Sequence, residues 1–140
     1  MDILSKIIVK KMESLNQLKR LCSVRDLEKS KFFNRNNKSI ANSLKENETS
    51  IIAEHKRKSP SKSEINFQTP SEKIIKGYQK AGAAALSILT EENFFNGSNK
   101  DISNYRNITD LPILRKDFII DEFQIIESKS IGADGILLID

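Results

Sequence analysis

The sequence predicts an α/β protein with four parallel strands. After residue 50, short aliphatic segments alternate regularly with helical segments, which is typical of βαβ units. The aliphatic segments are nearly continuous, as expected for parallel strands covered on both faces. Each helical segment ends at a glycine-containing turn or before a proline. This pattern does not distinguish an open, doubly wound sheet from half of a closed barrel.

The first 49 residues predict a helical extension in front of this sheet. From residue 3 to residue 22, apolar residues recur at steps of three and four, the spacing of an amphipathic helix. Residues 30–50 are polar and rich in Asn and Lys, with a short helical segment near residues 40–44. We therefore divide the chain into an amino-terminal helical extension, residues 1–49, and a sheet-forming part, residues 50–140.

The elements of the sheet-forming part follow from the positions of the aliphatic segments and turns. The expected strands are residues 50–53, 84–89, 112–114 and 135–139. The expected helices are residues 71–80, 100–107 and 121–130.

Length and composition narrow the class of protein. The 140 residues suit one ordinary domain but fall short of the roughly 250 residues of a complete (β/α)8 barrel. No apolar segment reaches the length of a membrane span, and no signal-peptide core is present, so we expect a cytoplasmic protein without a membrane partner. The single cysteine, Cys22, cannot form an internal disulfide and is expected to be a small apolar residue of its helix.

The net charge of +4 and the pI of about 9.2 favour an anionic partner. The basic residues are spread along the chain among Asp and Glu, and aromatic residues make up only 6% of it. A surface for nucleic acid needs clustered cations and stacking aromatics, so we expect no nucleic-acid partner. A small phosphorylated metabolite fits this composition better.

Charged residues directly follow the first expected strand. Because side chains alternate along a strand, Glu54 and Lys56 point to one side, and His55 and Arg57 to the other. A carboxylate and an ammonium on the same side can hold each other ionised and present a cation to an anionic substrate. A solvated basic loop is the alternative interpretation of these charges, and the charge pattern by itself favours it.

The third expected strand also ends in charges, at Arg115, Lys116 and Asp117, followed by Phe118. A lysine in an apolar pocket can act as a proton donor, because such surroundings disfavour its charged form. An ordinary exposed lysine is the alternative interpretation of Lys116.

The loop after the second strand contains adjacent aromatics, Phe94 and Phe95, and then Asn96, Gly97 and Ser98. The phenyl rings either pack on the loop's own helix or line a pocket for an aromatic ring. Ser98 is suited to cap the helix that follows. With a single histidine, no cluster of metal ligands and no glycine-rich nucleotide loop, the sequence predicts an enzyme without metal or cofactor.

Four segments, taken together, closely resemble the indole-3-glycerol phosphate synthase family. They occur in the family's order and at the spacing of successive βα units: residues 51–61 (IIAEHKRKSPS), residues 85–91 with 95–98 (ALSILTE and FNGS), residues 111–118 (LPILRKDF) and residues 132–134 with 136–139 (GAD and ILLI). The amphipathic start resembles the family's amino-terminal extension. The resemblance implies a partial (β/α)8 TIM barrel containing strands 1 to 4.

The resemblance also implies a carbon–carbon lyase of tryptophan biosynthesis. The family's reaction closes a ring on 1-(2-carboxyphenylamino)-1-deoxyribulose 5-phosphate and releases carbon dioxide and water, without a cofactor. Lys116 matches the family's general acid, Lys56 the lysine that binds and activates the anionic substrate, and Glu54 the glutamate of the same cluster. The positions matching the substrate pocket are Ser59, Phe95, Phe118 and Leu137.

Two departures from the family pattern affect these expectations. Ser63 stands where the family usually has glycine, which reduces the freedom of that loop to adopt a left-handed conformation. The chain also stops at the fourth strand, whereas the family's catalytic base and its main phosphate-binding loops lie in the sequence after that strand. We therefore expect a truncated, catalytically incomplete form that self-associates through open barrel edges or folds only marginally. The alternative is a non-catalytic half-barrel that binds anions or serves as a scaffold.

Overall fold

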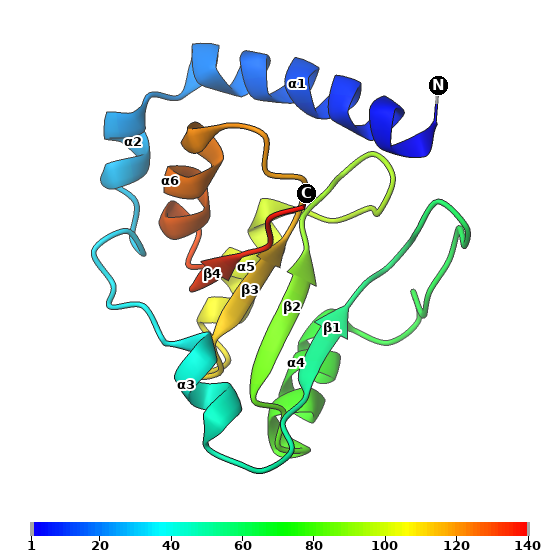
Figure 1. The fold of residues 1–140 in the computed structure, drawn as a ribbon, viewed down its shortest axis with the longest axis vertical. Helices are drawn as coiled ribbons and strands as arrows, with labels where there is room; N and C mark the ends of the chain where they lie inside the picture. Colours follow the sequence, from blue (N-terminus) through cyan, green and yellow to red (C-terminus); the bar gives the residue numbers. More distant parts are fainter. Residues whose placement is uncertain (1, 140) are drawn as a thin grey trace.

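The computed structural model describes residues 2–139, which form one parallel sheet with helices around it (Figure 1). The elements in chain order are α1 (Ile3–Leu21), α2 (Val24–Glu28), α3 (Ile40–Lys45), β1 (Ile52–His55), α4 (Ser71–Lys80), β2 (Ala85–Leu89), α5 (Asn99–Arg106), β3 (Ile113–Lys116), α6 (Glu122–Ser130) and β4 (Gly135–Ile136). Every expected helix and strand is present, and α2 is additional. Within residues 2–139, no helix has both the length and the apolar character needed to cross a membrane.

The strand order distinguishes a barrel wall from an open doubly wound sheet. All pairs are parallel, and the order is β1-β2-β3-β4, so each strand lies beside the next one in the chain. A doubly wound sheet reverses its strand order at a switch point, whereas a barrel adds strands in sequence. The four described strands contain no such reversal. Because right-handed crossovers then place the helices on one face, the other face is left as the interior.

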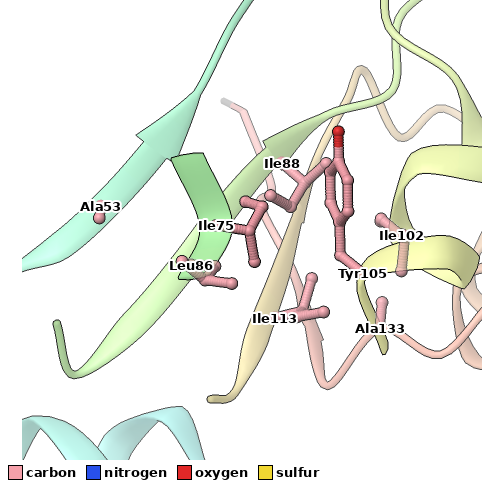
Figure 2. Packing of buried hydrophobic residues seen from close by; sticks show 8 residues of the cluster. All are labelled: Ala53, Ile75, Leu86, Ile88, Ile102, Tyr105, Ile113 and Ala133. Atoms are coloured by element: carbon pink, nitrogen blue, oxygen red, sulfur yellow. The ribbon is translucent and has the colours of Figure 1, made fainter. Parts of the chain in front are cut away.

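The hydrophobic core fills the space between the sheet and the helices α4 and α5. Figure 2 shows Ile102 and Tyr105 of α5 beside Ile88 and Ile113 of the sheet. Ile75 of α4 reaches the same cluster and, like these three isoleucines, is fully buried. Burying each such side chain contributes roughly 1.5–3 kcal/mol, so this layer supplies much of the force that holds helices to strands.

The opposite face of the sheet is less covered than the sequence predicted. Only β2 is buried at every position, while β1 and β3 alternate between buried and more exposed residues. The side chains that alternate outward from the core, including Glu54, Leu114 and Lys116, are half-buried. The expectation of strands covered on both faces is therefore wrong for β1 and β3, because α4 and α5 cover one face of the sheet while the inner-facing residues of these strands are only half-buried.

The strand boundaries also differ from the expected ones. β1 and β3 were expected to end at residues 53 and 114, but they continue to His55 and Lys116. Charged residues can extend these strands because their side chains form ion pairs on both faces of the sheet: Glu54 and Lys116 on the inner face, and Arg115 with Glu127 on the helix-covered face. β4 is shorter than expected, and after Ile136 only the Leu137 N–H still donates to the Arg115 carbonyl. Consequently Glu54 and Lys116 lie on rigid strands and not in loops.

The amino-terminal segment runs from the carboxyl ends of the strands down one side to their amino ends (Figure 1). At the carboxyl ends, Leu15 of α1 and Leu27 of α2 pack with Phe123 of α6. At the amino ends, α3 contacts the sheet, where Ser43 Oγ donates to the Ala84 carbonyl at 2.6 Å. The segment thus braces both ends of the sheet.

Helix α1 is attached by a mixture of apolar and ionic contacts. Of its apolar stripe, only Ile7 and Leu15 are buried, and Leu21 is 86% exposed. Two lysines outside the stripe, Lys11 and Lys19, instead form ion pairs with the segment between β3 and α6. Cys22 ends α1 and packs half-buried against the Leu15 cluster, as expected for a small apolar residue.

The buried His55 is expected to make stability depend on pH. It lies edge-on to Tyr105 with ring centroids 5.6 Å apart. Burial, together with the charge of Arg57, holds the pKa of His55 below 6.5, although Asp101 partly opposes this. The folded state therefore favours neutral imidazole, so the stabilising contribution is present above pH 6.5 and is lost as pH falls through the folded-state pKa.

His55 is the chain's only histidine, so its contribution can be isolated. Urea unfolding of the wild type and of His55→Gln, measured at several pH values from neutral to mildly acidic, checks the prediction. The wild type should lose free energy of unfolding on acidification, and the variant should lose less. Equal pH dependence in both proteins would contradict this account of the histidine.

Candidate active site

Three charged side chains meet on the inner face at the carboxyl ends of the strands. Glu54 Oε1 lies 3.0 Å from Lys56 Nζ, and Glu54 Oε2 lies 3.0 Å from Lys116 Nζ. Ser87 Oγ also donates to Glu54 Oε2, at 3.0 Å. We call these three charged residues, Glu54, Lys56 and Lys116, the lysine–glutamate cluster.

The cluster follows directly from strand geometry. Alternation along β1 places Glu54 and Lys56 on the same side, as predicted from the sequence. The parallel register then pairs Glu54 with Ser87 of β2, and Leu89 of β2 with Lys116 of β3. Neighbouring strands thus bring residues separated by 62 positions in the sequence into one ion-pair group.

The cluster carries a net positive charge, since two ammonium groups share one carboxylate. Burial raises the pKa of Glu54, but hydrogen bonds and charge from Lys116 and Lys56, with the Ser87 hydroxyl, outweigh it and hold that pKa below 4.5. Glu54 is therefore ionised at neutral pH. Lys116 is 40% exposed and forms an ion pair with Glu54, so the structure shows neither a lysine enclosed in an apolar pocket nor an unpaired surface lysine, the two interpretations that the sequence left open.

The outward-pointing residues of the same segment anchor it to the helices. Arg57 makes a bidentate pair with Asp101 of α5, at 2.5 and 2.9 Å, and donates to Ser71 Oγ of α4 at 3.1 Å. The alternative interpretation of this segment as a solvated basic loop is therefore wrong. Arg57 fixes the start of the loop that follows β1, while Lys56 remains available on the inner face.

The two predicted aromatic residues of the site lie beside each other. Phe95, in the loop after β2, and Phe118, after β3, have ring centroids 6.3 Å apart with planes tilted by 40°. Both rings are half-buried. Because Phe118 follows Lys116 by two residues, an apolar surface adjoins the charged cluster. The observed partner of Phe95 is thus the ring of Phe118 in the next loop, and a pocket for an aromatic ring at this place stays a prediction.

A buried carboxylate shapes the loop that carries Phe95. Glu91 is fully buried, and its two oxygens accept the backbone N–H groups of Asn93, Phe94 and Phe95 at 3.1, 2.6 and 3.1 Å. The loop then closes tightly, because a Cβ at Gly97 would lie 2.3 Å from the Leu89 carbonyl oxygen. Glu91 and Gly97 together fix the backbone on which the phenyl ring stands.

Replacing Glu91 with glutamine is expected to loosen this loop. The amide group would present a donor to backbone N–H groups that need acceptors, and hydrogen bonds to a charged acceptor contribute roughly 1.5–3 kcal/mol. We expect hydrogen exchange at the amides of Phe94 and Phe95 to accelerate by about tenfold or more. The exposed neighbour offers a matched control, Glu92→Gln, which should leave exchange unchanged. Equal protection in the two variants would refute the role of Glu91.

The remaining predicted pocket residues, Ser59 and Leu137, lie on adjacent segments. Ser59 forms a turn with Lys62, in which Ser59 Oγ accepts the Lys62 N–H at 3.1 Å. Leu137 is half-buried directly after β4. Contact of these two residues with a substrate stays a prediction. The left-handed conformation expected to be restricted by Ser63 is adopted three residues later, by Asn66.

Sequence reasoning missed three polar residues of this region. Ser87 is the only polar residue in β2, and this was a signal that it faces the interior and not the apolar core. Glu91 and Asp117 gave no local signal, because each stands in a run of charged residues and only the fold shows which of them are buried. Within residues 2–139, no group of three or more metal-ligating side chains is assembled.

These features define a class of protein: a parallel α/β barrel-type fold with ionisable side chains at the carboxyl ends of its strands, the edge at which proteins of this architecture place their active sites. Comparison with known proteins gives the family. The family model described as indole-3-glycerol phosphate synthase matches residues 4–140. The chain belongs to the indole-3-glycerol phosphate synthase family, and its sheet is a partial (β/α)8 barrel.

Individual relatives agree with this assignment. The chain is 46% identical to the indole-3-glycerol phosphate synthase of Bacteroides thetaiotaomicron over 138 residues, which are 99% of this chain and 53% of that protein. It is 48% identical over 101 residues to the synthase of Leptospira interrogans, covering 72% of this chain and 40% of that protein. The Thermoanaerobacter pseudethanolicus synthase is 41% identical over 98% of this chain and 52% of its own length. The chain thus spans about half the length of these relatives.

Proposed function

We propose that the protein containing this chain is an indole-3-glycerol phosphate synthase. Its substrate is then 1-(2-carboxyphenylamino)-1-deoxyribulose 5-phosphate, which is converted to indole-3-glycerol phosphate, carbon dioxide and water in tryptophan biosynthesis. The observation that carries the proposal is the lysine–glutamate cluster at the carboxyl ends of β1 and β3, in a chain of this family.

In this proposal Lys116 is the general acid. An ammonium group has three N–H donors, and the contact with Glu54 at 3.0 Å uses one of them. The others remain available for the carbonyl oxygen of the substrate, which must gain a proton as the ring carbon attacks. Proton delivery requires a fixed donor, and a position at the end of a strand provides one.

Lys56 and the aromatic residues supply binding. Lys56 adds a second cation beside Lys116, which suits a substrate with phosphate and carboxylate groups. Phe95 and Phe118 offer an apolar surface for the phenyl ring of the substrate, and Ser59 and Leu137 complete the pocket. Ring closure, loss of carbon dioxide and loss of water need proton transfer but no net oxidation or reduction, so the proposal includes no cofactor.

Turnover by the complete encoded protein tests the proposed function. The protein is incubated with 1-(2-carboxyphenylamino)-1-deoxyribulose 5-phosphate, and indole-3-glycerol phosphate is followed by its fluorescence and identified by mass. Product formation is expected. Substrate binding without product would contradict the proposal and would favour the alternative of an anion-binding scaffold.

The outer edges of β1 and β4 suggest a second property of residues 1–140. Within residues 2–139 neither edge has a neighbouring strand, and the adjacent Ile51 and Leu138 are 64% and 72% exposed. Unpaired strand edges are templates for pairing with another chain. We propose that the protein is cytoplasmic. We also propose that residues 1–140, when present without the rest of the protein, bind a second copy of themselves through these edges.

Sedimentation velocity on residues 1–140 at increasing concentration tests this association. We expect a monomer–dimer equilibrium, and placing a charge on an edge, as in Leu138→Lys, should shift it towards monomer. A wild-type sample that stays monomeric throughout and melts cooperatively would contradict the proposal.

A further inference from the structure

Asp117 occupies an unusual position between two residues of the proposed site. Lys116 precedes it and points to the inner face, while Phe118 follows it. The Asp117 side chain points the other way and is only 1% exposed. A buried carboxylate is stable only when its oxygens are bonded, and each oxygen here has two partners. These are Lys11 Nζ and the Phe118 N–H on Oδ1, at 2.7 and 2.8 Å, and Thr90 Oγ1 and Arg115 Nη2 on Oδ2, at 2.6 and 3.3 Å.

These partners belong to separate elements, so the carboxylate joins them. Thr90 directly follows β2, Arg115 lies in β3, and Lys11 lies in α1. Arg115 in turn donates to Glu127 of α6 at 2.7 Å. The backbone between Lys116 and Phe118 is therefore tied directly to α1, to β3 and to the residue after β2, and through Arg115 to α6.

Helix α1 reaches this point through ion pairs more than through close packing. Lys11 binds Asp117 at the start of the segment between β3 and α6, and Lys19 binds Asp121 at its end, at 2.5 Å. The segment lies beneath α1 in Figure 1. A pocket of about 360 Å³ adjoins these contacts, and its lining includes Lys11 and Leu18 of α1, Asp117 of the segment and Gln124 of α6. The ion pairs thus set how α1 sits over the segment.

We propose that Asp117 is a positioning residue for Lys116 and Phe118, and that Lys11 of α1 completes the set of partners that holds it. The amino-terminal helix then contributes to catalysis without touching substrate. This inference rests on the proposed synthase function. A displacement of about 1 Å can lower a rate by about a hundredfold, so loss of one of the four partners is sufficient for a measurable effect.

Three variants of the complete encoded protein test the proposal. Lys11→Met removes the charge and keeps the aliphatic stem, Lys11→Arg retains a cation, and Lys10→Met is a matched control on the same helix. Lys10 pairs only with Glu13 of its own helix among the described residues, and both side chains are 56% exposed. We expect Lys11→Met to lower kcat about tenfold with little change in KM, Lys11→Arg to restore most of it, and Lys10→Met to have no effect.

Assays well below the melting temperature of each variant separate positioning from stability. A structural role alone would lower the melting temperature and leave kcat unchanged. Lys11→Met combined with Asp117→Asn should be no slower than Asp117→Asn alone, because both changes disrupt the same contact. A kcat for Lys11→Met equal to that of Lys10→Met, or losses that multiply in the double variant, would overturn the proposal.

Hydrogen exchange gives a readout that does not depend on turnover. The Phe118 N–H donates to Asp117, so Lys11→Met should accelerate its exchange and Lys10→Met should not. If the wild-type protein forms no product, the proposed synthase function is refuted. The exchange rate of the Phe118 amide would then still show whether Lys11 holds the segment between β3 and α6. Unchanged exchange at Phe118 in Lys11→Met would overturn the positioning role.

Discussion

Replacing Lys116 with methionine in the complete protein is expected to lower kcat by about two to four orders of magnitude, the usual contribution of a positioned general acid. Methionine retains much of the side-chain length but has no proton to donate. Because the proton transfer occurs in the transition state, kcat and kcat/KM should fall together while substrate affinity changes little. Steady-state kinetics with the fluorescent indole product measures both constants.

Two further variants make this result specific to Lys116. Lys116→Arg keeps a cation beside Glu54 but binds its proton more tightly, so it should remain strongly impaired. Lys100→Met removes an exposed lysine of α5 and should have the activity of the wild type. If Lys116→Met retained more than about a tenth of the wild-type kcat, Lys116 would not be the general acid.

Replacing Asp134 with asparagine is expected to cause the largest loss of stability. The Asp134 side chain has no exposed surface and accepts from Arg106 at 2.7 Å and from Arg35 at 2.8 Å. It also accepts the backbone N–H groups of Lys38 and Ile113, at 2.7 and 2.8 Å. Neutralising it leaves a buried guanidinium of Arg106 without its counter-ion, which typically costs about 3–5 kcal/mol.

An exposed aspartate provides the control for this measurement. The Asp110 side chain is 97% exposed and lies 3.5 Å from Lys38, so Asp110→Asn should change the free energy of unfolding by less than about 0.5 kcal/mol. Urea unfolding monitored by circular dichroism compares both variants with the wild type. Equal midpoints for Asp134→Asn and Asp110→Asn would show that this buried network does not support the fold.

The charged part of the site was predictable because it depends on local rules. Alternation along β1 places Glu54 and Lys56 together, and parallel pairing brings the ends of β1 and β3 to one edge of the sheet. The aliphatic pattern likewise predicted the order of helices and strands. It did not predict the singly wound strand order, for which the resemblance to a barrel family was needed.

The supporting residues were not predictable because their partners are distant in sequence. Nothing near Asp117 indicates that Lys11, more than a hundred positions earlier, completes its surroundings. Likewise, nothing near Asp134 in the sequence indicates its ion pair with Arg35 of the amino-terminal segment. The apolar stripe of α1 predicted a helix. It did not predict that Leu21 is exposed or that Lys19 forms an ion pair, because both depend on where the helix lies over the carboxyl ends of the strands.

Carbon dioxide release tests most directly the claim that the lysine–glutamate cluster carries out ring closure with decarboxylation. The complete encoded protein is given substrate labelled with ¹³C in its carboxylate, and labelled carbon dioxide and indole-3-glycerol phosphate are quantified together. We predict equal amounts of both from the wild type, and substrate binding but almost no release from Lys116→Met. Label that stays in bound, unreacted substrate with the wild type, or equal release by the variant, would contradict the claim.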